Sequence, residues 1–336
     1  MIFVLMAGQE KMILRKELLR EPVKDVRLMD IADESEELME KYRSIGGFST
    51  KYLVKAADIL LEAITSSTRI AMAFPANLVS TGVRGLIADL IRAGLSDVVM
   101  TTGGTFDHDI ARGLGCSYYV GEFEMDDALL KELEIHRLGN ILIPMENYGP
   151  PIEKFVHEMM EELSKTKDSW STYELAHECG RRIKDETSIL KAVFDRNRLL
   201  FSPGIFDSAF GTAIFTFNEK RRSKSLPSQV KLDLIEDERK IAEYVYSVDS
   251  LTGIILGGGI SKHHLIWWAQ FRGGLDYAIQ ITSAPEWDGS LSGARTREAI
   301  SWGKIKPQAK HVTVPGDVTF LFPLLIGYVA KKAGIV

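Results

Sequence analysis

The chain has 336 residues, of which 45% are hydrophobic and 26% are charged, so it is long enough and apolar enough to bury a full globular core. Its 41 basic and 46 acidic residues give a formal net charge of −5, and we therefore expect neither nucleic acid nor an anionic membrane surface as a partner. The two cysteines, Cys116 and Cys179, form no CxxC pair, which is typical of buried free thiols in a reducing, cytoplasmic protein.

The first 65 residues are predicted to be a helical N-terminal arm. Their opening apolar run, residues 1–8, is too short for a signal peptide and lacks a basic start. Helical patterns follow at 33–43 and 50–66. From 66 to 336 we expect one globular domain, because no repeat and no proline-rich or serine-rich linker interrupts the pattern.

Seven short β-branched runs, each ending in glycine or small polar residues, are predicted to be strands: 69–74, 97–102, 141–145, 199–202, 252–256, 277–282 and 311–314. Most are apolar on both faces, which is typical of parallel strands buried between two layers of helices. Helical patterns separate them, among them an amphipathic stripe at 82–93, a capping box at Ser171–Glu174 and a long helix at 229–247. This alternation predicts an α/β fold with a doubly wound, mostly parallel sheet, helices on both faces, and ligands at the carboxyl ends of the strands.

Glycines and small polar residues follow three of these strands, in Asn77–Gly82, Thr101–Thr105 and Gly257–Gly259. Such turns let backbone N–H groups approach a phosphate, and the N-terminus of a following helix adds a favourable dipole. None has the GxGxxG spacing of the Rossmann motif, so each alone could be an ordinary tight turn. Their recurrence at three strand ends favours a nucleotide-binding edge.

The stretch from Glu286 to Ile305, EWDGSLSGARTREAISWGKI, concentrates small residues, acids and two tryptophans in a pattern that neither a core helix nor a plain loop requires. Lys304 follows Ser301-Trp302-Gly303, so it lies just past a helix-ending glycine and beside a large aromatic ring. Burial there would favour the neutral amine and make Lys304 a candidate nucleophile, whereas the alternative is an ordinary solvated lysine. If the preceding segment is helical, Glu298 and Trp302 share a face that suits an alkylammonium group.

Two adjacent histidines, His263 and His264, follow the triple glycine. Adjacent side chains face different ways, and no cysteine or HExxH motif accompanies them, so we expect no metal site. A histidine that forms a hydrogen bond to a substrate amine is the favoured interpretation, and a solvated loop histidine is the alternative. The sequence also lacks a GxSxG nucleophile elbow, which argues against a hydrolase.

Taken together, these segments resemble the deoxyhypusine synthase family. The matching motifs are, in chain order, ANLVSTG (76–82), TTGG (101–104), FSPGIFD (201–207), GIILGGGISKHH (253–264), FRGGLDYAI (271–279), EWDGSLSGARTREAISWGKI (286–305) and GDVTFLFPLL (316–325). The resemblance extends from about residue 40 to the end of the chain and looks like that of an archaeal member. Such a long ordered set is far more specific than any one motif.

The resemblance implies a Rossmann-like NAD-binding catalytic domain at 66–336 and an enzyme that uses NAD to oxidise spermidine to an imine. A lysine of the enzyme then carries the aminobutyl group, with release of 1,3-diaminopropane. That group passes to one lysine of a translation initiation factor, where the retained hydride reduces the product to deoxyhypusine. By the same resemblance we expect a cytoplasmic homotetramer.

The family's functional positions carry over to named residues of this chain. Lys304 matches the lysine nucleophile, and His263, Glu298 and Trp302 match positions that line the amine pocket. The positions that match those around NAD are Asn77, Ser80, Thr101, Thr102, Asp207, Gly258, Ser283, Ala284, Asp288 and Asp317.

One segment of the chain departs from the family's pattern TDGSxGD. Thr212 replaces the closing aspartate, which anchors a spermidine ammonium group in the family, and Phe210 adds bulk nearby. One lost charge-assisted contact costs about 1.5–3 kcal/mol, which is enough to change the amine that binds. The departure therefore favours, as an alternative, a related NAD-dependent transferase of the homospermidine synthase type. A catalytically silent NAD-binding partner subunit is a further alternative, against which the intact Lys304 argues.

Overall fold

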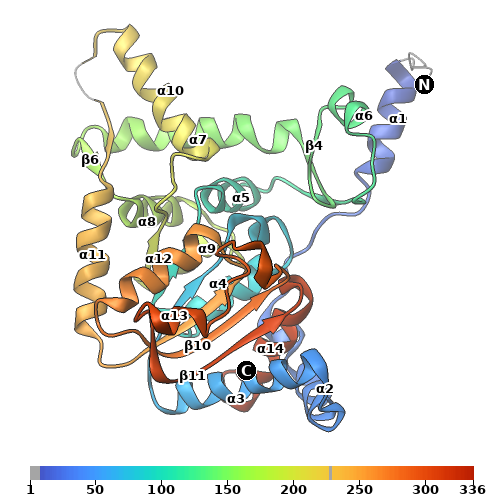
Figure 1. Ribbon diagram of the computed structural model, residues 1–336. Coiled ribbons are helices and arrows are strands. Elements are labelled where there is room, and N and C mark those ends of the chain that lie inside the picture. Colours follow the sequence, from blue (N-terminus) through green and yellow to red (C-terminus); the bar gives the residue numbers. More distant parts are fainter. Residues whose placement is uncertain (1–7, 227–228) are drawn as a thin grey trace.

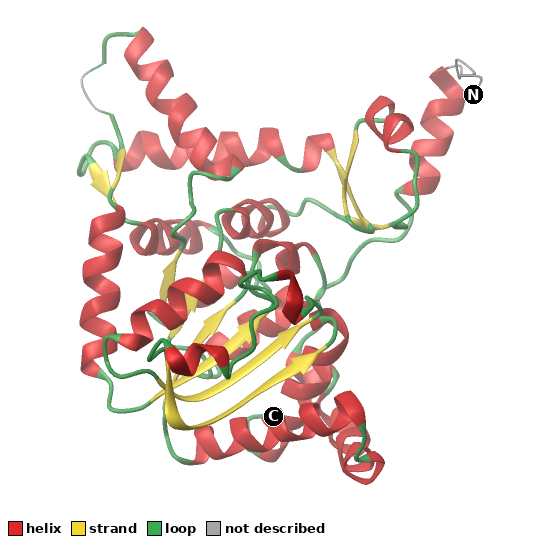
Figure 2. Cartoon of the chain, in the orientation of Figure 1, coloured by secondary structure: helices red, strands yellow, loops and turns green. Residues whose placement is uncertain are grey.

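The computed structural model describes residues 8–226 and 229–336, and a six-stranded sheet lies at its centre (Figure 1). The strands are β1 (Arg69–Ala73), β2 (Val98–Met100), β7 (Leu199–Phe201), β9 (Leu251–Leu256), β10 (Leu275–Thr282) and β11 (Ile305–Pro315). All neighbours pair in parallel, in the order β11-β10-β9-β1-β2-β7. Helices cover both faces of the sheet, as Figure 2 shows, and the predicted doubly wound α/β fold is confirmed.

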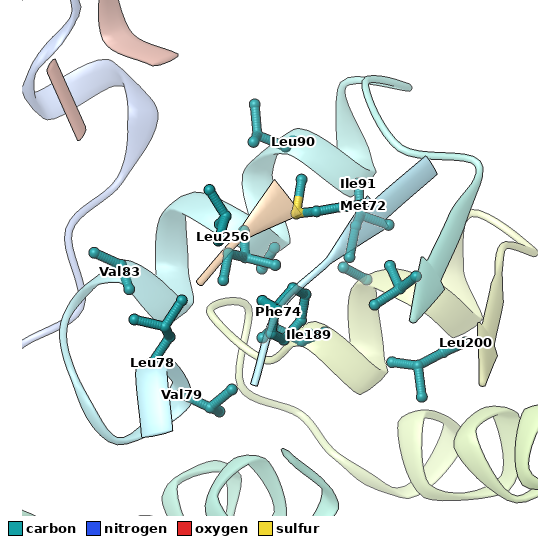
Figure 3. Close-up of a cluster of buried hydrophobic side chains, with 14 of the residues drawn as sticks. Met72, Phe74, Leu78, Val79, Val83, Leu90, Ile91, Ile189, Leu200 and Leu256 are labelled. Carbon is teal, nitrogen blue, oxygen red and sulfur yellow. The ribbon is translucent and has the colours of Figure 1, made fainter. Parts of the chain in front are cut away.

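Alternation of side chains divides the hydrophobic core between the two faces of the sheet. Met72 and Phe74 pack on one face, in the cluster drawn in Figure 3, whereas Ala71 and Ala73 pack on the other. The first face is covered by α3 (Phe48–Thr65), α4 (Val83–Arg92) and α14 (Val318–Lys332), and the second by α11 (Leu234–Ser247) and α12 (Gly259–Gln270). The small alanines of the second face let α12 approach the sheet closely.

The chain changes its direction of travel across the sheet at the neighbouring strands β1 and β9. From β1 it proceeds outward through β2 to β7, and it then returns to β9 on the other side of β1 and continues to β10 and β11. Such a switch leaves a crevice at the carboxyl ends of the two strands, where ligands of doubly wound folds bind. At this crevice Gly257 adopts a φ of +73° and lies against Pro75, a conformation that glycine takes without strain.

The segment 141–145 does not belong to the parallel sheet, so that part of the prediction is wrong. It forms β5 (Ile141–Pro144), the middle strand of an antiparallel sheet with β3 (Tyr119–Val120) and β4 (Ile135–Leu138). The turn at Gly139-Asn140 joins β4 directly to β5, and so short a connection requires an antiparallel pair.

This small sheet and its covering helices form a lobe beside the main sheet (Figure 1). Helix α1 (Gly8–Leu18) packs on the lobe together with α6 (Asp127–Glu132). Leu14 and Leu18 of α1 join the apolar cluster of Leu130 and Leu142. This cover buries the Leu142 face of β5, and Ile141 and Ile143 on its other face pack in the main core, so β5 is apolar along its whole length.

The remaining elements connect the sheet to its periphery. They are the helices α2 (Ala32–Ile45), α5 (Gly104–Gly113), α7 (Gly149–Leu163), α8 (Thr172–Arg182), α9 (Ile189–Asp195), α10 (Ala209–Ser223) and α13 (Glu298–Ser301), the turns η1 (Leu28–Asp30), η2 (Ala76–Ser80), η3 (Met145–Asn147) and η4 (Glu286–Asp288), and the strand pair β6 (Ser169–Trp170) and β8 (Lys231–Leu232). Figure 1 shows α7 and α10 projecting together beyond α5. Among the described residues, no helix is both long enough and apolar enough to cross a membrane.

Two helix starts test the sequence patterns. The capping box is confirmed, because Ser171 N donates to the Glu174 carboxylate at 3.0 Å where α8 begins. The helix predicted from residue 229 begins only at Leu234, since β8 precedes it and Asp233 accepts the N–H of Glu236 at 2.9 Å as a cap. The division of the chain at residue 65 stays a prediction.

Arg84 of α4 is the centre of a buried charge network that joins distant segments. Its guanidinium donates to Asp109 at 2.6 Å, to Asp25 at 2.7 Å and to Asp185 at 2.8 Å. Burial would lower the pKa of Arg84, but the three carboxylates outweigh it and hold that pKa above its ordinary value. Asp109 also accepts the N–H of Leu190 at 2.7 Å, so the network fixes the start of α9 to α5 and to the N-terminal segment.

Candidate active site

A cavity of about 260 Å³ lies between α12, α13 and the loop that precedes α13. Its lining residues come from three stretches of the chain: Lys262, His263, Ile266, Trp267, Leu291, Ala294, Arg295, Glu298, Ala299, Trp302 and Lys304. The structure thus brings together four residues that the sequence analysis singled out, namely Lys304, His263, Glu298 and Trp302.

The end of α13 places Lys304 in this cavity. Gly303 adopts a φ of +68° after the helix, and its N–H donates to Ile300 O at 2.9 Å. Lys304 N donates to Ala299 O at 3.0 Å, which closes the turn and directs the chain into β11. The Lys304 side chain is consequently buried, with 7% of its residue surface exposed.

Lys304 lies against a histidine and two indoles. Its Nζ is 3.4 Å from His263 Nε2, 4.9 Å from the ring centre of Trp302 and 5.6 Å from that of Trp267. His263 in turn stacks on Trp267, with ring centres 5.6 Å apart. Burial, and secondly the charge of Lys304, lower the pKa of His263, so its imidazole is neutral near pH 7 and can accept a proton from an amine.

Glu298 supplies the negative charge of the cavity. It is the first residue of α13, and Trp302 caps the other end of this short helix, so both side chains line the same cavity. A carboxylate beside indole faces is a favourable receptor for an alkylammonium group. Trp287, at the far end of the same sequence stretch, is 89% exposed and does not line the cavity.

Lys262 is a buried member of the cavity that the sequence analysis missed. Its Nζ donates to Leu291 O at 2.8 Å and to Ala294 O at 2.5 Å, which ties the loop to α12. Burial lowers the pKa of Lys262 to about 8.

Trp267 was missed as well, although its spacing of four residues from His263 would have placed it on the same helical face. His264 faces away, since its Nε2 lies 3.9 Å from Glu238 of α11.

The residues matched to a cofactor site follow the carboxyl ends of the strands. Asp207, Asp288 and Asp317 are exposed there, after β7, β10 and β11, and exposed carboxylates suit the hydroxyls of a ribose. Asn77 and Ser283 are exposed at the ends of β1 and β10, and Ala284 is half-buried beside Ser283. The N-termini of α5 and α12 open onto the same edge and favour a pyrophosphate. The residues at this edge therefore fit a dinucleotide.

Three other residues of the set form hydrogen bonds within the protein that support this edge of the sheet. Thr101 is buried, and its hydroxyl donates to Phe74 O at 2.9 Å. Thr102 Oγ1 accepts the N–H of Ala76 at 3.0 Å, and buried Ser80 donates to Asn77 O at 2.7 Å. These contacts hold the turns after β1 and β2 in place, so the three hydroxyls shape the edge.

Gly258 packs against the loop before α13. A Cβ built on it would lie 2.3 Å from Ser292 Cα, closer than two atoms can approach without movement of one backbone. Valine at this position would therefore disturb the fold as well as block a ligand. Glycine here is required by the contact between the two turns.

The segment that departs from the family's pattern lies at the start of α10. Thr212 is exposed, its hydroxyl donates to Ser208 O at 3.0 Å, and it is not among the residues that line the amine cavity. Phe210 is fully buried against Phe106, with ring centres 4.8 Å apart, so its bulk fills the core and does not narrow the cavity. Asp107 accepts the N–H of Phe210 at 2.8 Å and so fixes this helix start.

A doubly wound sheet with a lysine, a histidine and a carboxylate in one cavity places the chain in the α/β class of folds. Comparison with known proteins is more specific. The family profile described as "Deoxyhypusine synthase" matches residues 37–329. Proteins named "Probable deoxyhypusine synthase" are 48% identical in Ignicoccus hospitalis, over 95% of this chain and 98% of that protein, and 50% identical in Sulfolobus acidocaldarius, over 93% and 97%.

The chain therefore belongs to the deoxyhypusine synthase family, whose members are transferases. A solved structure of an Entamoeba histolytica protein assigned as a deoxyhypusine synthase superposes with a TM-score of 0.60 at 19% identity, covering 91% of this chain and 96% of that one. That likeness concerns the fold, and it agrees with the parallel sheet described above.

Proposed function

We propose that the chain is an NAD-dependent transferase that moves the aminobutyl group of spermidine to one lysine of a translation initiation factor. The main support is the position of Lys304, a buried amine 3.4 Å from a histidine whose pKa is lowered. Family membership supplies the reaction class, and the cavity supplies a carboxylate and two indoles that suit a polyamine.

The residues of the cavity have separate roles in this reaction. NAD, when bound, would accept a hydride from the carbon next to the secondary amine of spermidine and return it to the product imine. Neutral His263 takes the proton that the Lys304 amine loses as it attacks the imine carbon. His263 returns that proton to the departing nitrogen, the C–N bond to 1,3-diaminopropane breaks, and Lys304 carries the aminobutyl group as an imine. The acceptor lysine displaces Lys304 by the same exchange.

The walls of the cavity protect this carried group. Ile266 and Ala299 are buried, and together with Trp267 and Trp302 they surround Lys304. Lys304 is 7% exposed, so these walls restrict the access of water, which would hydrolyse the imine, although Trp267 and Trp302 are themselves 41% and 64% exposed. Glu298 holds a terminal ammonium group of the amine and sets the distance between that group and the attacking lysine.

We also propose that the active enzyme is a cytoplasmic homotetramer. Within one chain, Thr212 does not line the amine cavity, although its position matches a family residue that contacts spermidine. A second copy that presents the start of α10 to the cavity would reconcile the two observations. The loss of the aspartate at Thr212 is also the one feature that favours another amine as donor or acceptor.

Mass spectrometry of the purified chain tests the proposal. With NAD and spermidine, the enzyme should gain an aminobutyl mass after borohydride reduction, and the acceptor factor should gain the same mass when it is present. An enzyme adduct with no transfer to the factor, but with transfer to putrescine, would instead support the homospermidine synthase type of reaction. The absence of any adduct with NAD and either amine would contradict both.

A further inference from the structure

A second cavity, of about 320 Å³, lies beside the edge strand β11 and shares Arg295 with the amine cavity. Its lining comes from α3, from the loop before α13 and from β11: Tyr52, Lys55, Arg295, Thr296, Arg297, His311, Val312, Thr313 and Pro315. Three of these side chains are cationic and a fourth is a histidine, whereas none is a carboxylate. The cavity therefore carries an excess of positive charge.

Arg295 is incompletely paired in this cavity. Its Nη1 is buried and has no hydrogen-bond partner among the described residues. Its nearest carboxylate, Glu286, lies 3.8 Å from Nε and is shared with Arg297, which forms an ion pair with it. That nitrogen is closed off from solvent, so an oxyanion in the cavity would instead meet the accessible part of the Arg295 side chain, 16% of its surface, which Glu286 offsets only at 3.8 Å.

Polar groups of β11 and the loop complete the cavity wall. Thr296 Oγ1 lies 2.9 Å from His311 Nδ1 and 3.2 Å from Thr313 Oγ1, so these side chains are held in a fixed arrangement. Burial, and secondly the charge of Lys55, lower the pKa of His311, so its imidazole is neutral near pH 7 and contributes hydrogen-bonding nitrogens and no charge. Hydroxyls, an imidazole and cations around one space are the groups that bind phosphate.

We propose that this cavity binds a phosphate group, either as free phosphate or as part of a small phosphorylated molecule. The guanidinium of Arg295 and the ammonium of Lys55 supply the charge, and Arg297 lies at the rim. None of its residues belongs to the turns after β1, β2 or β9, but Pro315 ends β11 two residues before Asp317, so the site adjoins the β11 end of the dinucleotide edge.

The shared Arg295 would couple this site to the amine cavity. Its positive charge repels cations and is one of the causes that lower the pKa of Lys262. A bound phosphate would compensate that charge, so the adjoining cavity should accept a cationic amine more readily, and the amine should strengthen phosphate binding equally. This coupling rests on the proposed function, whereas phosphate binding itself does not.

Calorimetric titration of the full chain with inorganic phosphate tests the site, at constant ionic strength and without NAD or amine. We expect saturable binding that Lys55→Gln weakens about fivefold, the effect of losing one charged contact. Lys51→Gln, one turn earlier on α3 and outside the cavity, is the matched control and should leave binding unchanged. A parallel titration with adenosine monophosphate distinguishes the two possible ligands. If it binds more tightly than phosphate, the ligand is a phosphorylated metabolite, and if the two bind equally, the ligand is free phosphate.

Three results would overturn the proposal. They are the absence of saturable phosphate binding, equal weakening by Lys51→Gln and Lys55→Gln, and loss of phosphate binding when NAD is present, which would assign the cavity to the cofactor. A further titration with spermidine tests the coupling alone. Phosphate binding that spermidine does not strengthen would remove the coupling and leave the phosphate site standing.

Discussion

Lys304 Nζ and His263 Nε2 lie 3.4 Å apart, although the two residues are 41 positions apart in the sequence and belong to different elements. The contact depends on two local structures, the glycine turn after α13 and the first turns of α12. It places a proton acceptor within reach of the one amine that both the sequence pattern and the cavity single out.

We expect Lys304 to be the covalent carrier. Borohydride reduction in the presence of NAD and spermidine should place an aminobutyl mass on the peptide that contains Lys304, and Lys304→Ala should abolish the adduct. Lys262→Met is the matched variant, because Lys262 is the other amine of the cavity. It should retain the adduct on Lys304. An adduct on Lys262 in the wild-type enzyme would contradict the assignment.

The same contact predicts a change in the titration of His263. Burial lowers the pKa of His263, and the charge of Lys304 lowers it further. In Lys304→Met only the burial effect remains, so the pKa should rise toward its ordinary value without reaching it. NMR titration of the imidazole measures this directly. An unchanged or lower pKa in the variant would show that the two side chains are not in contact in solution.

The close approach of Gly258 and Ser292 predicts a loss of stability on Gly258→Ala. The added Cβ would lie 2.3 Å from Ser292 Cα and must displace the loop before α13, at a cost of about 1–3 kcal/mol in the free energy of unfolding. Gly289→Asn is the control in the same loop, because Gly289 has open space around it and a φ of +71° that asparagine tolerates. Denaturant unfolding measures both, and equal stability of the two variants would refute the prediction.

Thr212→Asp should restore an anchor for an ammonium group of spermidine. A charge-assisted contact is worth about 1.5–3 kcal/mol, so the KM for spermidine should fall roughly tenfold or more. Ser223→Asp, at the opposite end of α10, controls for the added charge. Because Phe210 is buried in the core, it should not obstruct the new contact. A KM that does not change would mean that this helix start does not face the amine.

The network around Arg84 predicts a large effect on stability and none on the chemistry of the cavity. Arg84→Leu leaves Asp109, which is fully buried, and Asp185 without their cation, whereas Asp25 keeps Arg112 at 3.1 Å, and the change should lower the free energy of unfolding by about 3–5 kcal/mol. Arg196→Leu, at an exposed arginine, should change it little. Thermal and denaturant unfolding measure the free energy of unfolding of both variants. Similar losses of stability in the two would contradict a structural role for the network.

The parallel sheet could be predicted because both faces of its strands are buried, which produces short apolar runs between amphipathic helices. The same rule failed for 141–145, since a central strand of a small antiparallel sheet is also covered on both sides. Periodicity reports burial, whereas it does not report which strand is the neighbour. The short turn before Ile141 was the available signal of a hairpin.

The residues of the cavity could be predicted where they are close in the sequence. They were harder to predict where the backbone path of a loop determines which groups meet. Glu298, Trp302 and Lys304 share one short segment, and the resemblance supplied His263. Lys262 was not foreseeable in the same way, because its partners are the carbonyl groups of Leu291 and Ala294, whose directions depend on the path of a loop. No side-chain pattern encodes where such carbonyls point.

The packing of α1 on the lobe has a consequence for synthesis on the ribosome. Leu14 and Leu18 leave the exit tunnel early, but their partner Leu142 is translated well over a hundred residues later. At ordinary rates of translation these two leucines wait roughly ten seconds for their docking surface. During that interval its leucines are available to chaperones or to other nascent chains, and α2 waits longer still, because its partner α14 is translated only at residues 318–332.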